Sequence, residues 1–457
     1  MIVIKFGGTS VGDSERMEEA IEIVAAARDR RPVVIVSALA GVTNQLVEAA
    51  RLAADGSIDE VTGIVEAIRE RHESVARELV RQKSDYLESF MKQLRRHTDQ
   101  ILDILKGIAH VGEVTQRAGD KIVAIGEKLS SLLFAYSLRL RTFPGEYIDS
   151  EEVIITDARF GQASPLMNET KAAAGRVLLP ELERNHIPVM GGFIGRSLQG
   201  ATTTLGRGGS DYSAAIVGAA IEAEEIQIWT DVDGMMTTDP RINPEAKIID
   251  VISYVEAAEL AYFGAKVLHP KTIAPAVERG IPIRVLNTRN RTSRGTLITR
   301  EGKSESGPRA IAVKNGITVV HITTSQMLGA HGFLARIFKE FDEESVPVDL
   351  VTTSEVSVSV TIDRSDKIES LTGRLRAFAE VDVMPSQSII AIVGRNLMRD
   401  PAVWGSIFPA LAGVRISMIS LGTSDLNLSI AVPEKEAERA VRSLHRVLFE
   451  SERAEVA

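Results

Sequence analysis

The chain of 457 residues contains no cysteine, and this absence excludes several kinds of protein. Without a thiol there is no disulfide bond, no thiolate ligand for a metal and no cysteine nucleophile. Long apolar runs are also lacking, so the sequence predicts no membrane-spanning helix. The N-terminus reads as a strand with no basic stretch before it, so we expect no secretory signal and a cytoplasmic protein.

Positive charge is outnumbered by negative charge. Lys and Arg number 53 against 62 Asp and Glu, which gives a net charge of −9. Such a balance argues against general binding to nucleic acid or to an acidic membrane. The 44% hydrophobic and 25% charged content are ordinary for a globular protein, and the length suffices for two or three domains.

Short apolar segments alternate with helical patterns over the first part of the chain. Residues 1–5 and 33–36 predict buried strands, and residues 14–24 predict a helix between them. This alternation indicates an α/β domain with a mostly parallel sheet. Residues 57–106 are charged and nearly free of Gly and Pro, so they predict a helical hairpin that forms a lid or side wall.

The character of the chain changes after about residue 290. Residues 291–309 are rich in Arg, Ser, Gly and Thr and predict a linker. Residues 332–360 and 403–430 then form a weak repeat, each reading as loop, helix, strand, turn and alternating strand, which fits two βαββαβ units. The predicted boundaries are 1–290 for the first domain, 291–309 for the linker and 310–457 for the tail, with repeats at about 320–385 and 386–457 and a strand at 310–319 that joins the second repeat.

Two glycine-rich loops each carry a cation: KFGGTS at residues 5–10 and GRGGSD at residues 206–211. Glycines let backbone N–H groups approach a ligand, and the helix that follows the second loop offers unpaired N–H donors and a partial positive charge. Lys5 supplies a point charge, and Arg207 supplies a planar fork that suits a carboxylate or phosphate. The loops together indicate an enzyme that handles phosphate.

Other polar residues are weaker candidates when each is taken alone. Ser37 and Thr43 follow the second predicted strand, Glu127 lies in a helical pattern, and WTDVDG at residues 229–234 ends another strand. The alternatives are a plain loop with a helix cap, a solvated glutamate and an Asp-Gly turn without a ligand. No Walker A sequence is present, so phosphate handling would use another fold.

The order and joint presence of these motifs resemble the aspartokinases, which belong to the amino-acid-kinase family. The matching motifs are residues 5–10, 36–38 with 41–44, 192–195, 206–211, 229–234 with 238–241, and 263–270. The tail resembles the paired ACT domains of these enzymes, and residues 348–360 resemble the lysine-sensitive, single-function type. The resemblance implies an α/β amino-acid-kinase fold, an αβα sandwich with a mostly parallel sheet, followed by two ACT (βαββαβ) domains.

This resemblance implies ATP-dependent and Mg²⁺-dependent phosphorylation of the β-carboxylate of L-aspartate, the first step of lysine, threonine and methionine biosynthesis. It implies catalytic roles for Lys5 and Asp211. The implied aspartate site comprises Ser37, Thr43, Glu127, Phe193, Arg207 and Ser210. The implied nucleotide site comprises Lys5, Gly7, Gly8, Thr230, Asp231, Met236, Arg241, Lys266 and Val267. No residue is assigned to a metal. Met236 departs from the family, which often has Tyr there, so we expect only apolar contact from it.

The paired ACT repeats imply feedback inhibition by an end-product amino acid. The expected effector residues are Met327, Gly332, Phe333, Leu334, Val348, Asp349, Thr353, Ser354 and Glu355. The carboxylates of Asp349 and Glu355 favour lysine over threonine, although both could lie on solvated loop ends. We expect a homodimer through the ACT region, or a tetramer built from it.

Two other functions compete with this interpretation. One is an amino-acid kinase of the same fold that acts on glutamate or on an acylated amino acid, and the paired tail repeats count against it. The other is a non-catalytic amino-acid sensor, against which the presence of Lys5 and Asp211 counts.

Overall fold

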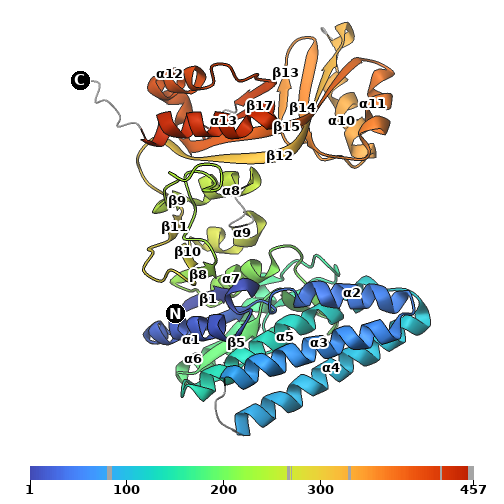
Figure 1. Ribbon diagram of the computed structural model, residues 1–457, viewed down its shortest axis with the longest axis vertical. Coiled ribbons are helices and arrows are strands. Elements are labelled where there is room, and N and C mark those ends of the chain that lie inside the picture. The colour runs from blue at the N-terminus through green and yellow to red at the C-terminus, as the bar shows by residue number, and fades with distance from the viewer. Residues whose placement is uncertain (80–84, 265–267, 269, 328–330, 422–424, 451–457) are drawn as a thin grey trace. The chain divides into compact units, whose positions relative to one another are not determined.

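The computed structural model describes the whole chain except residues 80–84, 265–267, 269, 328–330, 422–424 and 451–457. The chain divides into two compact units (Figure 1). The first comprises Met1–Met235 and Leu268–Gly302, and the second comprises Met236–Val267 and Lys303–Ala457. Among the described residues, no helix is long and apolar enough to cross a membrane.

A mostly parallel sheet forms the centre of the first unit. The strands that the first unit contributes are, in spatial order, β3 (Gly145–Tyr147), β5 (Ile187–Gly191), β2 (Pro32–Val36), β1 (Ile2–Phe6), β8 (Glu225–Thr230), β10 (Ile283–Asn287) and β11 (Thr296–Thr299). Of the pairs between these strands, only that of β10 with β11 is antiparallel. Both β1 and β2 are buried along their whole length, as expected for apolar strands covered on both faces.

Helices surround this sheet and complete its core. They are α1 (Ser14–Ala26), α2 (Val42–Ala54), α3 (Ile58–Leu79), α4 (Asp85–Val111), α5 (Gln116–Leu140), α6 (Met167–Glu183), α7 (Gly209–Ala220) and α9 (Pro270–Arg279). The central strands pack against α5 and α7. The hairpin expected in residues 57–106 is confirmed as α3 and α4, which pack beside α2 and α5 and share one apolar core with them. It is therefore a side wall of the unit.

A second, three-stranded sheet of β4 (Ile155–Thr156), β6 (Ile194–Ser197) and β7 (Thr202–Thr204) leads the chain into the glycine-rich loop before α7. Farther along the chain, the structure differs from the expected linker at 291–309. Its residues Thr296–Thr299 form β11, in which Thr296 and Ile298 are buried and alternate with less buried neighbours. This short alternation was hidden among polar residues.

The second unit contains an antiparallel sheet with the order β13 (Val351–Thr353), β14 (Ser357–Asp363), β12 (Gly307–Thr323), β15 (Glu380–Arg395), β17 (Asn427–Pro433) and β16 (Met418–Leu421). Strands β12 and β15 have 17 and 16 residues and pair along nearly their whole lengths. One end of this long pair is flanked by β14, and the other end by β17. Each long strand therefore serves both repeats.

Helices cover the two halves of this sheet separately. They are α10 (Phe333–Glu343) and α11 (Ile368–Arg376) on the first half, and α12 (Pro401–Ala410) and α13 (Glu434–His445) on the second (Figure 1). The same unit contains β9 (Val251–Ser253) and α8 (Tyr254–Tyr262). The expected repeats of helix and strands are present. Residues 307–314 pair with residues 389–395 of the second repeat, whereas residues 317–323 pair with residues 357–363 of the first.

Candidate active site

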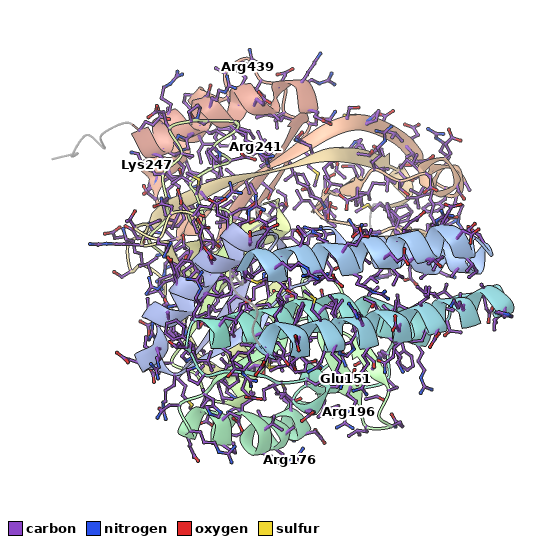
Figure 2. The ribbon with its side chains drawn as sticks, turned by 60° about the horizontal axis from the view of Figure 1, so that its bottom comes forward. Glu151, Arg176, Arg196, Arg241, Lys247 and Arg439 are labelled. Atoms are coloured by element: carbon purple, nitrogen blue, oxygen red, sulfur yellow. The ribbon has the colours of Figure 1, made fainter. Side chains whose placement is uncertain are left out.

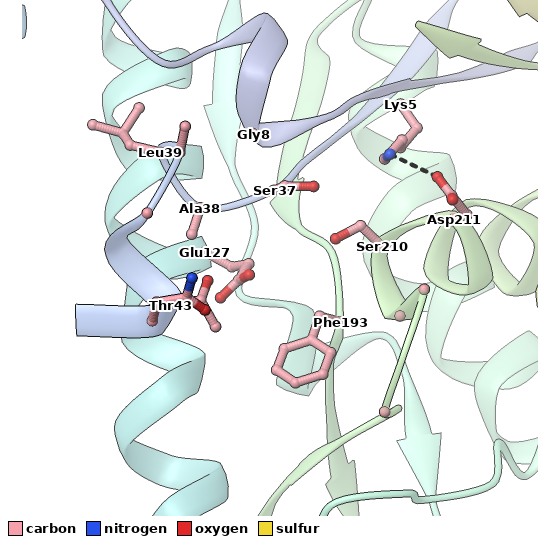
Figure 3. Close-up of a pocket in the computed structure, with 16 residues that line it drawn as sticks. Lys5, Gly8, Ser37, Ala38, Leu39, Thr43, Glu127, Phe193, Ser210 and Asp211 are labelled. Carbon is pink, nitrogen blue, oxygen red and sulfur yellow. Dashed lines mark ion pairs between the residues drawn. The ribbon is translucent and has the colours of Figure 1, made fainter. Parts of the chain in front are cut away.

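A cavity of about 400 Å³ opens in the first unit where β1 and β2 end and where α2 and α7 begin. Figure 3 shows polar side chains from these elements turned toward one space. The expected site residues that line it are Lys5, Gly8, Ser37, Thr43, Glu127, Phe193, Ser210 and Asp211. The structure thus brings together residues from five distant stretches of sequence.

Lys5 and Asp211 form an ion pair at the wall of this cavity. Lys5 lies within β1, whose backbone is paired on both sides, so its side chain has a fixed origin. Its Nζ lies 2.6 Å from Oδ1 of Asp211, and the side chains are 10% and 17% exposed (Figure 3). Asp211 lies in the first turn of α7, where the helix dipole favours a carboxylate. It can hold the ammonium in one orientation.

Two helices point their N-termini into the cavity. The N-cap residues are Gly41 of α2 and Gly208 of α7, with φ of 87° and 71°, values that favour glycine. The N–H groups of Val42 and Gly209 donate to the carbonyls of Leu39 and Gly206, so a ligand would meet the N–H groups of the residues that follow them. These helix starts and Lys5 make the cavity suitable for anions.

Glu127 of α5 is the buried acid of the cavity, only 4% exposed. Burial raises its pKa to about 8, although hydrogen bonds with the backbone, chiefly that of Ala38, oppose the shift. Its Oε2 is buried without a hydrogen-bond partner among the described residues. A ligand ammonium would supply the missing partner and favour the ionised form.

Phe193 is held in a left-handed conformation, with φ of 67°, that is uncommon for a residue with a side chain. Its backbone N–H donates to Oγ of Ser213, 2.9 Å away. Gly209 makes room for it, because a Cβ at that position would lie 2.4 Å from Cδ2 of Phe193. The ring is thus fixed beside the start of α7.

Asp120 was not predicted from sequence, yet it supports the loop that enters α7. It is 4% exposed and lies seven residues before Glu127 on α5. Its carboxylate accepts the N–H groups of Gly161 and Thr204 and the Thr204 hydroxyl, the last at 2.8 Å. The signal in the sequence was weak, because an isolated Asp in a helical pattern usually faces solvent.

Two expected residues do not line the cavity. The side chain of Arg207 is exposed, although its neighbours Gly206 and Gly208 are lining residues. Gly7 lies one residue from the lining Gly8, and a Cβ on it would lie 3.7 Å from Nζ of Lys5. Their roles stay predictions.

The expected nucleotide residues are divided along the chain. Thr230 ends β8 in the first unit and is followed by the exposed Asp231. In the second unit, Met236 is half-buried and pairs with Ile248, and Arg241 forms an ion pair with Asp239 at 2.6 Å. Lys266 and Val267 lie outside the described residues. Among the described residues, no group of three or more His, Asp or Glu could hold a metal ion.

The second unit has a cavity of about 660 Å³ before α10 and after β13. The expected effector residues that line it are Met327, Gly332, Phe333, Leu334, Thr353, Ser354 and Glu355. His331 lines it too and was not predicted. Gly332 caps α10 with φ of 77°. This arrangement combines a helix N-terminus for a carboxylate with a glutamate for an ammonium.

Val348 and Asp349 do not line this cavity. Instead, Oδ2 of Asp349 lies 2.7 Å from Nζ of Lys314, and Oδ1 accepts the hydroxyl of Tyr262 at 2.8 Å. Lys314 is also 2.8 Å from Asp363. The role of Asp349 toward an effector stays a prediction, but its carboxylate has two partners within its own unit.

Comparison with known proteins gives the same assignment. Residues 1–287 match the amino acid kinase family, and residues 314–372 and 390–448 each match an ACT domain. Aspartokinase 2, chloroplastic, of Arabidopsis thaliana is 36% identical over 98% of this chain and 84% of its own length. Lysine-sensitive aspartokinase 3 of Escherichia coli is 37% identical over 98% of this chain and 99% of its own length.

Solved structures agree. Escherichia coli aspartokinase III in complex with lysine and aspartate has a TM-score of 0.82 at 36% identity, over 98% of this chain and 99% of that chain. The same enzyme with aspartate and ADP also has a TM-score of 0.82 at 36% identity, over 98% of this chain and 100% of that chain. The expected fold class is confirmed, and the chain belongs to the aspartokinases of the amino acid kinase family.

Proposed function

We propose that the cavity of the first unit transfers the γ-phosphoryl group of ATP to the β-carboxylate of L-aspartate. The observation that carries this proposal is the Lys5–Asp211 ion pair at the start of α7, in the same cavity as the buried Glu127. The E. coli relative, whose structures contain aspartate, ADP and lysine, supports the choice of substrates. We propose that this chain binds the same kinds of ligand.

The chemistry needs no general base. A model aspartate carboxyl has a pKa of about 4, so the nucleophile is already ionised at neutral pH. A carboxylate oxygen forms a bond to the γ-phosphorus while the bond to the β,γ-bridging oxygen breaks, which leaves ADP and 4-phospho-L-aspartate. The obstacle is repulsion between two anions, and the Lys5 ammonium and the positive ends of the α2 and α7 dipoles offset it.

Mg²⁺ fits this site as a companion of the nucleotide. Magnesium commonly binds through substrate phosphates and only one or two carboxylates, which agrees with the lack of a dedicated acidic cluster among the described residues. When bound, it neutralises charge on the phosphate oxygens. The expected nucleotide contacts at Gly7, Gly8, Thr230, Asp231, Met236, Arg241, Lys266 and Val267 belong to this proposal.

Recognition of the amino acid rests on charge at both ends of the substrate. Glu127 accepts the α-ammonium, which supplies the partner that its buried Oε2 lacks. Arg207 receives the α-carboxylate by turning its exposed guanidinium toward the cavity mouth beside Gly206 and Gly208. This pair of contacts selects an amino acid over a plain dicarboxylic acid.

The cavity of the second unit is the proposed feedback site, and lysine is the proposed effector. Glu355 is the lining carboxylate that suits a cationic amino acid, and the start of α10 suits its α-carboxylate. We further propose a homodimer through the ACT region. The exposure of all three residues of the edge strand β13 supports it. The other edge strand, β16, is joined to β13 by the bond from the Thr352 hydroxyl to the Ile419 carbonyl at 3.1 Å.

Hydroxylamine trapping tests the activity directly, because it converts an acyl phosphate to a hydroxamate, which forms a coloured complex with ferric ion. We expect product with L-aspartate, ATP and Mg²⁺, and little with L-glutamate, with N-acetyl-L-aspartate or without an acceptor. Product from glutamate or from the acylated amino acid would favour a related kinase. No product from any acceptor would leave an amino-acid sensor as the better interpretation.

A further inference from the structure

The segment of residues 236–247, which contains Met236 and Arg241, is bound to the end of the second ACT repeat. Nε of Arg442 on α13 donates to the carbonyl of Ile242 at 2.8 Å. Nζ of Lys247 donates to the carbonyl of Phe449 at 3.1 Å, in the π-helical turn Arg446–Glu450 that continues α13. Figure 2 labels Arg241 and Lys247 on this segment and Arg439 on α13.

His445, the last residue of α13, lies at the centre of this contact and is fully buried. Its Nδ1 is 2.7 Å from Oε1 of Glu450, and its Nε2 is 2.8 Å from Oγ1 of Thr237. Nδ1 also lies 2.9 Å from Nδ2 of Asn243, which can only donate, whereas the Glu450 carboxylate can only accept. The Thr237 hydroxyl can pair with Nε2 in either tautomer of the ring, because a hydroxyl both donates and accepts. The ring thus bridges α13 to the segment with both nitrogens used.

Thr237 connects His445 to the backbone of the segment through further hydrogen bonds. Its Oγ1 also accepts the N–H of Lys247 at 2.9 Å, its own N–H donates to the Lys247 carbonyl at 2.8 Å, and its carbonyl accepts the N–H of Ile311 at 2.7 Å. Asn243 adds a bond from its amide to Oε1 of Glu450 at 3.0 Å. The backbone that carries Met236 and Arg241 is therefore held at both ends of its turn.

We propose that His445 is a positioning residue for nucleotide binding, acting through Thr237 on the segment that carries Met236 and Arg241. The inference rests on the proposed function, because it takes these two residues as nucleotide contacts. A purely structural histidine is the alternative. Burying an imidazole is costly unless its nitrogens are paired, and both partners here lie in this segment or in the final turn rather than in the apolar core of the repeat.

Two conservative replacements separate the two bonds of the ring. His445→Gln places a carbonyl oxygen near the position of Nε2 and can still accept from Thr237. His445→Asn places its amide near Nδ1 and keeps only the bond to Glu450. We expect His445→Asn and the nearly isosteric Thr237→Val to raise the KM for ATP ~10-fold, with the KM for aspartate changed less than ~2-fold, whereas His445→Gln stays close to the unchanged protein.

The control is Arg439→Ala, on the same helix but bonded to the carbonyl of Gly413, 2.6 Å away within the repeat. It should leave the KM for ATP unchanged. Melting temperatures and direct titration with the non-hydrolysable analogue AMP-PNP accompany the kinetics, so that weak binding is distinguished from poor folding. Thr237→Val keeps the buried shape but also removes the acceptor of the Lys247 N–H, whereas His445→Asn leaves that bond in place. A rise in the KM for ATP that both variants share therefore identifies the bond between Thr237 and His445.

A selective loss of ATP affinity in His445→Asn and Thr237→Val supports the positioning role. Lower melting temperatures with an unchanged KM for ATP would overturn it and leave a structural histidine. An equal rise in both KM values would overturn it as well. The unchanged protein serves as the reference for the activity itself: if it makes no acyl phosphate, the proposed function fails independently of His445.

Discussion

At the scale of single residues, loss of the Lys5 ammonium should lower kcat more than loss of any other side chain of the cavity. Lys5→Ala removes the charge that offsets the repulsion between carboxylate and triphosphate, so we expect kcat to fall ~100-fold or more. Steady-state hydroxamate formation measures it. The matched control is Lys171→Ala, which removes an exposed lysine paired with Glu222. A Lys5→Ala enzyme with kcat within a few-fold of the original would exclude this role.

Glu127 should make aspartate binding depend on pH. Its pKa of about 8 means that the carboxyl of the empty cavity holds a proton at pH 6 to 7. The proton must leave when an ammonium binds, so the KM for aspartate should fall as pH rises, by at most ~10-fold per unit, and level off above pH 8. Glu127→Gln should bind weakly at every pH and show no such slope. A slope that persists in this variant would place the titrating group elsewhere.

The polar residues that line the cavity were easier to predict from the sequence than the residues that hold the surrounding loops in place. Lys5 and Asp211 could be predicted because glycine-rich motifs at strand ends and helix starts have a direct physical meaning. Asp120 could not, because only the tertiary fold brings Gly161 and Thr204 to it. The two partners of Asp349 come from positions 87 and 35 residues away in sequence, and no local pattern indicates them.

At the scale of secondary structure elements, the start of α7 depends on close packing. A Cβ on Gly209 would lie 2.4 Å from the Phe193 ring, so this ring, which lines the cavity, would have to shift. We expect Gly209→Ala to raise the KM for aspartate ~10-fold, since overpacking of this kind costs about 1–3 kcal/mol. Kinetics with both substrates varied measure it.

Gly175→Ala is the control for this element. Gly175 lies within α6, and a Cβ there would have no neighbour within 4 Å. The change should therefore stabilise the protein by about 0.5–1 kcal/mol and leave the kinetics alone. If Gly209→Ala behaved in the same way, the packing of Phe193 would not matter for substrate binding.

Long elements were predictable, and short ones were not. The charged stretch of residues 57–106, nearly free of Gly and Pro, predicted a hairpin, and α3 and α4 extend over 22 and 27 residues. Strand β11 has only four residues and lies in a stretch rich in Arg and Ser. Its extended conformation depends on antiparallel pairing with β10, which no local pattern indicates. The repeat could be recognised, whereas the length of β12 and β15 could not, because each joins two predicted segments.

At the scale of the whole molecule, lysine should reduce the activity by binding to the cavity before α10. A coupling of about 1–3 kcal/mol is enough to change substrate affinity several-fold. Glu355→Gln should raise the lysine concentration for half-inhibition ~10-fold, because it removes the lining carboxylate. The control is Glu369→Gln, an exposed acid on α11 outside the cavity. Inhibition by threonine but not by lysine would reverse the choice of effector.

The two long strands, β12 and β15, join the two ACT repeats into one folding unit. Neither repeat contains a complete sheet by itself, since β12 and β15 extend through both. Separating the repeats would therefore remove a paired strand from each of them. Both halves should therefore unfold in one cooperative step. Native-state hydrogen exchange should show the same opening free energy for Ile311 and Ile392 at one end as for Val320 and Val360 at the other. A substitution in β12 or β15 that alters the ligand site of one repeat would then also change the stability of the other repeat.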